Sequence, residues 1–204
     1  MDNKAPEDKV ATLVQSLFQS PGVPQFPYHN LEHTRTVVSH VTDLGIFYLL
    51  DHKVMIALKL AAWFHDIGHL DGSIELHEER SIRILEQQAS SLQIQPETLE
   101  AAAGYIRVTK SGAYPLTLPE QIICDADTWH FGTNEFLKTD QLVRQEMELR
   151  TKEKILNWYH DSFELLTTHQ FYTDYCQLLL TEGKHKNIEG LFAQIIKAEK
   201  HEPK

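Results

Sequence analysis

The sequence predicts an all-helical protein. Apolar residues recur at steps of three and four through most of the chain, which is the spacing of one face of an α-helix. Strand patterns, in which polar and apolar residues alternate between turn dipeptides, are scarce. Hydrophobic residues make up 42% and charged residues 24% of the 204 residues. This balance is typical of a globular protein with a sizeable core, and the length favours one domain over two.

The first expected helix lies near the N-terminus and ends before Pro21 and Gly22. Its apolar face consists of Val10, Leu13, Val14, Leu17 and Phe18. A loop should follow over residues 20–30, because its three prolines cannot continue a helix. Residues 1–9 and 198–204 are expected to be disordered, since charge and proline replace apolar periodicity there.

A second helix is expected after Asn30, whose side chain can cap the first turn. Its apolar face runs through Leu31, Thr34, Val37, Val38, Val41, Leu44 and Tyr48. A third helix through residues 55–66 is apolar on almost every side, as a central helix should be, and Gly68 and Gly72 mark its end. Further helices are expected near 75–90, 96–107 and 119–130, one or two more from about 134 to 182, and a last one from 187 to 199.

Composition excludes several classes of function. A formal charge of −10 argues against binding to a nucleic-acid polymer. Cys124 and Cys176 are far apart and form no CxxC pair, which argues against a disulfide framework or a thiolate zinc site and favours two small core residues. The chain has neither a signal-peptide core nor an apolar stretch long enough to cross a bilayer. We therefore expect a cytoplasmic protein without a membrane partner.

Histidine and carboxylate residues gather in four segments, 28–33, 64–69, 75–81 and 124–132. Each segment lies at or near an expected helix end among apolar neighbours, and burying several ionisable groups is costly unless a metal ion offsets the cost. The adjacent His65 and Asp66 offer an imidazole nitrogen and a carboxylate oxygen to the same ion. With His33 and an aspartate from a later helix, the ligands are mixed nitrogen and oxygen. Such a set suits Mn, Mg, Fe, Co or Zn, and positions left to water favour catalysis.

The order of these residues resembles the HD-domain superfamily of metal-dependent phosphohydrolases. Tyr28-His29-Asn30 precedes the first histidine, HDIGH surrounds the second, and an aspartate follows. The Tyr-His-Asn start is also similar to the entrance of the cyclic-nucleotide phosphodiesterase catalytic domain. The resemblance covers the motif-bearing core, about 26–132, and a helical extension of about 134–200 has no matching motif. It implies an HD-domain or phosphodiesterase-like helical bundle that forms a single domain over 1–204.

The resemblance implies that the metal ligands are His33, His65, Asp66 and Asp127. Asp66 would also act in catalysis, and it would bridge to a second ion if two bind. Asp125 is an alternative to Asp127, because the two lie two residues apart in CDADTW. The family pattern favours the second aspartate, so Asp125 would orient a ligand or cap the helix.

Two further histidines match catalytic positions of the family. His29 matches the general acid, which protonates the leaving oxygen, and a surface loop histidine is the alternative. His69 matches the second histidine of HDxGH, which contacts phosphate or orients a water. Its alternative role is a histidine that interacts with the dipole at a helix C-terminus.

Substrate contacts are expected from two other segments. His77 and Glu78 could line the cavity, or His77 could join a second metal ion, and a solvated helix face is an equal alternative. Arg107 and Lys110 are the best candidates for phosphate contacts, followed by Arg35 and Thr109, against a default of surface solvation. Four aromatic residues are expected in the core: Trp63, Trp129, Phe131 and Tyr159.

The implied function is hydrolysis of a nucleotide or another small phosphomonoester or phosphodiester, with one or two divalent ions and water as the attacking group. Two alternatives remain. The same scaffold can hold a di-iron centre for oxygenase chemistry, and a domain that retains its metal could be a non-catalytic nucleotide sensor. Substrate identity, native metal and oligomeric state do not follow from the sequence.

Overall fold

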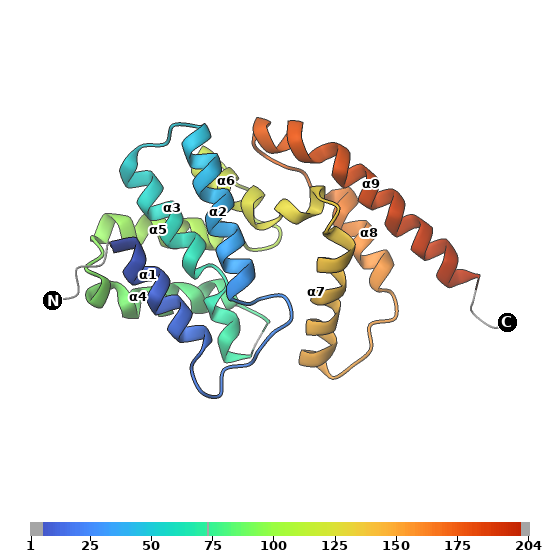
Figure 1. Cartoon of the computed structure of the whole chain (residues 1–204), viewed down its shortest axis with the longest axis horizontal. Helices are drawn as coiled ribbons and strands as arrows, with labels where there is room; N and C mark the ends of the chain where they lie inside the picture. Colours follow the sequence, from blue (N-terminus) through green and yellow to red (C-terminus); the bar gives the residue numbers. More distant parts are fainter. Residues whose placement is uncertain (1–5, 73, 201–204) are drawn as a thin grey trace. The chain divides into compact units, whose positions relative to one another are not determined.

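A computed structural model describes residues 6–72 and 74–200, and within them the chain is helical without a strand (Figure 1). This confirms the all-α prediction. The elements are α1 (Pro6–Phe18), α2 (Leu31–Phe47), α3 (His52–Phe64), the 3-10 helix η1 (Ile67–Asp71), α4 (His77–Leu92), α5 (Pro96–Val108), α6 (Leu118–Asp127), the 3-10 helix η2 (Trp129–Gly132), α7 (Phe136–Thr151), α8 (Trp158–Thr168) and α9 (Asp174–Glu199).

The chain divides into two compact units, Met1–Asp127 and Thr128–Lys204. The first contains α1 to α6 and, up to Asp127, the histidine and carboxylate segments described above. The second contains η2 and α7 to α9. That the whole chain acts as a single domain stays a prediction.

Helix α3 is the centre of the first unit, as its apolar sequence predicts. It packs against α2 and α5 (Figure 1), and seven of its thirteen residues are buried. These are Ala57, Leu58, Leu60, Ala61, Ala62, Trp63 and Phe64. Burial of this apolar face supplies most of the driving force that holds the helix in place. The two residues that follow it, His65 and Asp66, are therefore held at the end of a rigid element.

The loop before α2 is anchored by Asn30, which confirms the predicted cap. Its Oδ1 accepts hydrogen bonds from the backbone nitrogens of Glu32 and His33 at 2.9 and 3.2 Å. Its Nδ2 donates to the backbone oxygens of Phe26 and Pro27 at 3.3 and 3.0 Å. One side chain thus satisfies the helix end and fixes the loop that carries His29.

The end of the third helix differs from the sequence-based expectation. The helix stops at Phe64, and η1 begins at Ile67 after His65 and Asp66, with Gly72 in the left-handed region at φ +88° as its C-cap. Gly68 lies inside η1 and does not end the helix. A Cβ at Gly68 would collide with the backbone carbonyl of His77, so this glycine allows the start of α4 to approach η1.

In the second unit, the helix break that was expected between residues 182 and 187 does not occur. Helix α9 runs without interruption over 26 residues, and Gly183 lies inside it. A Cβ at Gly183 would collide with the backbone oxygen of Gly132 in η2, so this glycine also serves a close approach. Asn187 reinforces the contact by donating to the backbone oxygens of Phe131 and Thr133 at 2.9 and 2.8 Å.

The chain ends are more ordered than the sequence predicts where they are described. Residues 6–9 form the start of α1, and α9 continues to Glu199. Expected disorder at 1–5 and 201–204 lies outside the described residues. Among the described helices, none has both the length and the hydropathy that crossing a membrane requires.

The predicted small core residues and aromatic core residues are only partly buried. Cys176 is buried and Cys124 is half-buried, and both are free thiols. Trp63 and Phe131 are core residues, whereas Trp129 and Tyr159 keep part of their surface exposed. Burial raises the pKa of the Cys124 thiol to about 12, so this thiol is not a nucleophile near neutral pH.

Candidate metal centre

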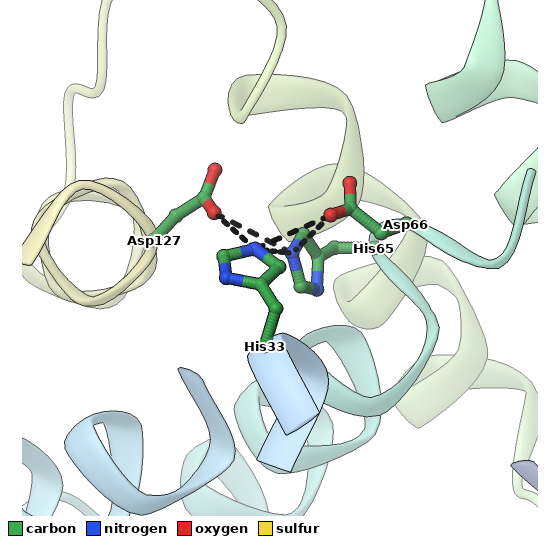
Figure 2. A group of neighbouring side chains, drawn as sticks. All are labelled: His33, His65, Asp66 and Asp127. Atoms are coloured by element: carbon green, nitrogen blue, oxygen red, sulfur yellow. Dashed lines mark hydrogen bonds and ion pairs between the residues drawn. The ribbon is translucent and has the colours of Figure 1, made fainter. Parts of the chain in front are cut away.

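Four side chains converge on one point in the first unit (Figure 2). His33 comes from the first turn of α2, His65 and Asp66 follow α3, and Asp127 is the last residue of α6. His33 Nε2 lies 3.1 Å from Asp127 Oδ1, 3.3 Å from Asp66 Oδ2 and 3.4 Å from His65 Nε2. One ligand atom of each residue lies within 4.8 Å of all the others. We call this set the HD cluster.

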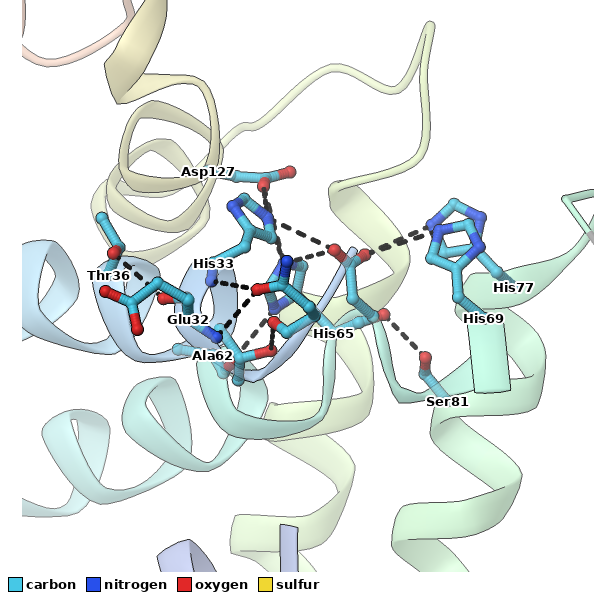
Figure 3. Close-up of polar contacts among 12 residues, drawn as sticks. Glu32, His33, Thr36, Ala62, His65, His69, His77, Ser81 and Asp127 are labelled. Carbon is cyan, nitrogen blue, oxygen red and sulfur yellow. Dashed lines mark hydrogen bonds and ion pairs between the residues drawn. The ribbon is translucent and has the colours of Figure 1, made fainter. Parts of the chain in front are cut away.

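The ring of His65 is fixed by a backbone hydrogen bond. Its Nδ1 lies 2.8 Å from the carbonyl oxygen of Ala62 (Figure 3). Because a carbonyl oxygen can only accept, Nδ1 carries a proton and donates it. Nε2 then faces the HD cluster, 3.2 Å from Asp66 Oδ2. A histidine held in this way presents one defined nitrogen to a ligand.

Ser81 of α4 holds the turn that carries Asp66. Its Oγ donates to the carbonyl of His65 at 2.6 Å (Figure 3) and accepts from the backbone nitrogen of Gly68 at 2.8 Å. The side chain is completely buried. No role for Ser81 was predicted from the sequence beyond its place in the ELHEERS segment, where it is the one small hydroxyl among charged residues.

Asp66 also faces a second group of histidines. Its Oδ1 lies 3.9 Å from His69 Nε2 and 3.7 Å from His77 Nε2. The His69 ring stacks on that of His77 at 4.0 Å between centroids, and His29 lies 4.1 Å from His69 on the same measure. His29, Asp66 and His69 form a second set whose ligand atoms lie within 4.8 Å of one another. The two oxygens of Asp66 therefore face two different groups, as a bridging carboxylate requires.

The position of His77 and Glu78 was left open by the sequence. Glu78 is buried, and its Oε1 lies 3.6 Å from His77 Nε2. The side chain of His77 is 22% exposed and faces Asp66. These two side chains therefore belong to the interior of the first unit, whereas Glu79 beside them points to the surface.

Charge and burial act against each other in the HD cluster. Burial alone would lower the pKa of His65, but Asp66 and Asp127 outweigh it and hold that pKa well above its usual value. The pKa of His33 is raised in the same way. Burial alone would raise the pKa of Asp66, but His65, His29 and the hydrogen bond from His33 hold it well below its usual value. Both carboxylates thus stay ionised and demand positive charge.

The donor set fits a divalent ion. Two imidazole nitrogens and two carboxylate oxygens converge at short distances in a buried place, and with neutral imidazoles the cluster carries two negative charges. This combination suits a first-row metal or magnesium and could hold one.

Asp127, and not Asp125, enters the HD cluster. Asp127 Oδ1 lies 3.1 Å from His33 Nε2 and 3.5 Å from His65 Nε2. Asp125 is fully buried and belongs to neither of the two potential ligand sets found among the described residues. The geometry favours Asp127, and its role as a ligand stays a prediction.

The basic residues expected to contact phosphate lie at the surface. Arg107 Nε donates to Glu79 Oε1 at 2.9 Å, and both side chains are about half exposed. Lys110 is exposed and, after Arg107, helps to lower the pKa of Glu79. Arg35 donates to Gln15, and Thr109 donates to the backbone of Ile106. Within the described part of the chain, no hydrogen bond or ion pair joins Arg107 or Lys110 to the HD cluster.

Two solved structures share this fold. One is a predicted HD superfamily hydrolase from an uncultured Thermotogales bacterium, with a TM-score of 0.60 and 17% identity over 94% of this chain and 91% of that one. The other is Bacillus subtilis YpgQ in complex with ADP, with a TM-score of 0.64 and 18% identity over 97% and 95%. Neither the family models nor the curated proteins gave a match. The likeness confirms the predicted HD-type helical fold.

Proposed function

We propose that this chain is a metal-dependent phosphoric ester hydrolase that acts on a nucleotide or another small phosphomonoester or phosphodiester. The observation that carries the proposal is the convergence of His33, His65, Asp66 and Asp127 within a fold shared with HD hydrolases. The ADP bound to YpgQ supports a nucleotide as the class of substrate.

The four residues of the HD cluster would hold the ion, which we expect to be Mn, Mg, Fe, Co or Zn. When bound, such an ion supplies Lewis acidity, which lowers the pKa of a coordinated water and offsets charge on phosphoryl oxygens. A second ion would take Asp66 Oδ1 together with His69 and either His29 or His77. His29 cannot both ligate an ion and donate a proton, so the number of ions and the role of His29 are linked.

The other roles in the reaction would fall to side chains around the HD cluster. His29 would protonate the leaving oxygen, because it lies in the loop beside the HD cluster, with its ring 4.1 Å from that of His69 and 6.1 Å from that of His33 between centroids. Asp66 would orient the attacking water through its ionised carboxylate. His69 and His77, which face Asp66 Oδ1, would contact the phosphoryl group. Contacts from Glu78, Arg107 and Lys110 to the substrate stay predictions.

Elemental analysis of the purified chain, followed by a panel of phosphoesters with Mn, Mg, Co and Fe, tests the proposal. We expect one or two ions per chain and hydrolysis with at least one of these metals. Metal-replete protein that binds a nucleotide saturably without hydrolysis would make the chain a sensor instead. Iron content with oxygen uptake on a polyol or phosphonate would point to an oxygenase.

Two variants separate ligation from proton transfer. His65→Ala should lose metal and turnover together, because it removes a buried ligand that no neighbour can replace. His29→Ala should keep the metal of the HD cluster and slow turnover by about 10²- to 10⁴-fold, the usual contribution of a general acid. If His29→Ala loses an ion, His29 is a ligand and a different group must donate the proton.

A further inference from the structure

A cavity of about 350 Å³ lies in the first unit, formed by the end of α1, the loop before α2 and the first turn of α2. We infer that this cavity, named here the loop cavity, binds the uncharged part of the substrate, a nucleoside or a sugar, and that hydrolysis releases this part as a neutral alcohol. The inference rests on the proposed phosphohydrolase function and deepens it.

His29 places the loop cavity next to the HD cluster. The residue lines the cavity, and its ring lies 4.1 Å from that of His69 and 6.1 Å from that of His33 between centroids. Asn30, which caps the helix that carries His33, lines the cavity as well. The loop cavity therefore adjoins His29, the proposed proton donor, and so lies where the leaving group of a phosphate ester held at the HD cluster would sit.

The walls of the loop cavity combine aromatic and amide groups. Phe18 and Phe26 are buried and give it an apolar side. Gln25 donates from Nε2 to the backbone oxygen of Phe18 at 3.2 Å, which orients its amide and leaves Oε1 available to accept. Gln19 also lines the cavity, is exposed, and makes no side-chain hydrogen bond to another described residue. Amides that can donate and accept, set beside aromatic rings, suit hydroxyls and the edges of a nucleobase.

The lining of the loop cavity favours an uncharged group over a phosphate. No lysine or arginine is among its lining residues, and its single carboxylate is that of Glu32. The lining residue that can carry a positive charge is His29, whose proton is assigned to the leaving oxygen, so a phosphate or pyrophosphate in the cavity would meet a like charge without a cation of its own. The volume is also at the lower end of the roughly 300–1,000 Å³ found for ligand sites, which leaves room for one nucleoside or sugar.

The substrate class that follows is a phosphomonoester of a neutral, nucleoside- or sugar-sized alcohol. In the reaction, the bond between phosphorus and the ester oxygen breaks, and the oxygen of water forms the new bond to phosphorus. His29 gives a proton to the departing oxygen, and the proton that the attacking water loses returns to His29 through solvent, so that the ester and one water yield the alcohol and inorganic phosphate. A nucleoside monophosphate is hydrolysed in this way, whereas a pyrophosphate leaving group does not fit the loop cavity.

Kinetics of a variant that fills the loop cavity test the inference. Gln19→Trp adds bulk at an exposed position without breaking a described side-chain hydrogen bond. We expect it to lower kcat/KM for adenosine monophosphate about tenfold and to leave ethyl phosphate, which has no group to fill the cavity, unchanged. The matched control is Gln87→Trp, an exposed position on α4 that does not line the cavity. It should affect neither substrate.

Two further measurements keep the inference independent of that variant. Adenosine alone should bind the protein in calorimetry, and Gln19→Trp should weaken this binding about tenfold. Glu32→Gln should raise the rate on pyrophosphate relative to adenosine monophosphate, because it removes the carboxylate. Equal effects of Gln19→Trp on both esters, no effect on either, or wild-type protein that prefers pyrophosphate would each overturn the inference. Metal-loaded wild type that hydrolyses no phosphoester would instead refute the proposed function itself.

Discussion

The histidines of the HD cluster in the first unit and His169 in the second unit differ in the charges that surround them, and we call His169 with its neighbours the acid-poor group. In the HD cluster, Asp66 and Asp127 lie within about hydrogen-bond distance of His33 and His65. In the second unit, His169 Nε2 lies 3.1 Å from Thr128 Oγ1, between the rings of Phe131 and Phe171. Its charged neighbour is Lys184, whose Nζ donates to the backbone oxygen of His169.

The two groups show that burial alone does not make a histidine functional. Burial would lower the pKa of every one of these side chains. Carboxylates reverse that effect for His33 and His65, whereas Lys184 adds to it and lowers the pKa of His169 to about 4. The first group therefore attracts a cation, and the second holds a neutral imidazole that bonds to Thr128 as a structural contact.

The largest expected effect comes from the carboxylate that faces both ligand sets. Asp66→Asn keeps the size of the side chain but removes its charge, so the HD cluster comes to resemble the acid-poor group around His169. We expect metal content and turnover to fall to background together, as measured by elemental analysis and a phosphoester assay. Retention of a full complement of metal would show that Asp66 is not a ligand.

A matched pair of variants tests whether Asp127 or Asp125 is the second carboxylate ligand of the HD cluster. Asp127→Asn should weaken metal binding on the order of 100-fold or more, since even partners of ligands contribute 10- to 100-fold. Asp125→Asn, two residues away and fully buried, should instead lower the free energy of unfolding by about 1–3 kcal/mol and leave metal affinity unchanged. Metal titration and denaturant unfolding of both variants measure these effects. The reverse result would make Asp125 the ligand.

The lowered pKa of His169 should make the free energy of unfolding depend on pH. Because the pKa of His169 is about 4 in the folded chain, the unfolded chain takes up a proton first as the pH falls below about 6.5. Stability is therefore lost on acidification, and this residue contributes about 2 kcal/mol to the loss by pH 5. His169→Gln, which can still bond to Thr128, should flatten the curve between pH 7 and 5. Identical slopes for the variant and wild type in urea unfolding would contradict this account.

The smallest effect on the free energy of unfolding is expected from Arg107→Ala, which lies outside both groups. Arg107→Ala removes an exposed ion pair with Glu79, which is worth about 0–1 kcal/mol in the free energy of unfolding. If Arg107 also contacts substrate, the variant should raise KM without changing kcat. Thermal unfolding and steady-state kinetics separate the two outcomes, and Arg83→Ala on the exposed face of α4 provides a control.

The elements that bring the HD cluster together could be predicted from the sequence because their signals are local. Asn30 caps α2 as its position before an apolar periodicity predicts, and the central α3 follows from its continuous apolar run. The adjacent His65 and Asp66 had to lie close in space because they are adjacent in the chain. Their convergence with His33 and Asp127 rested on a family resemblance and not on periodicity.

What could not be predicted depends on contacts between distant backbones. A break between residues 182 and 187 was expected, yet Gly183 lies inside α9, where η2 passes too close for a side chain. Arg107 was a candidate for a phosphate contact against a default of surface solvation, and the local pattern does not reveal that Glu79 of another helix pairs with it. The buried bonds of Ser81 have the same cause, since their partners lie 13 and 16 residues earlier.

The collision that a Cβ at Gly68 would cause has a consequence for how this chain can evolve. The obstacle is the backbone of His77, so no change of a neighbouring side chain could relieve it. A mutation at position 68 therefore has no compensating change of a side chain, and the position stays closed to substitution. We expect homologues of this chain to keep the glycine even where their chemistry has diverged.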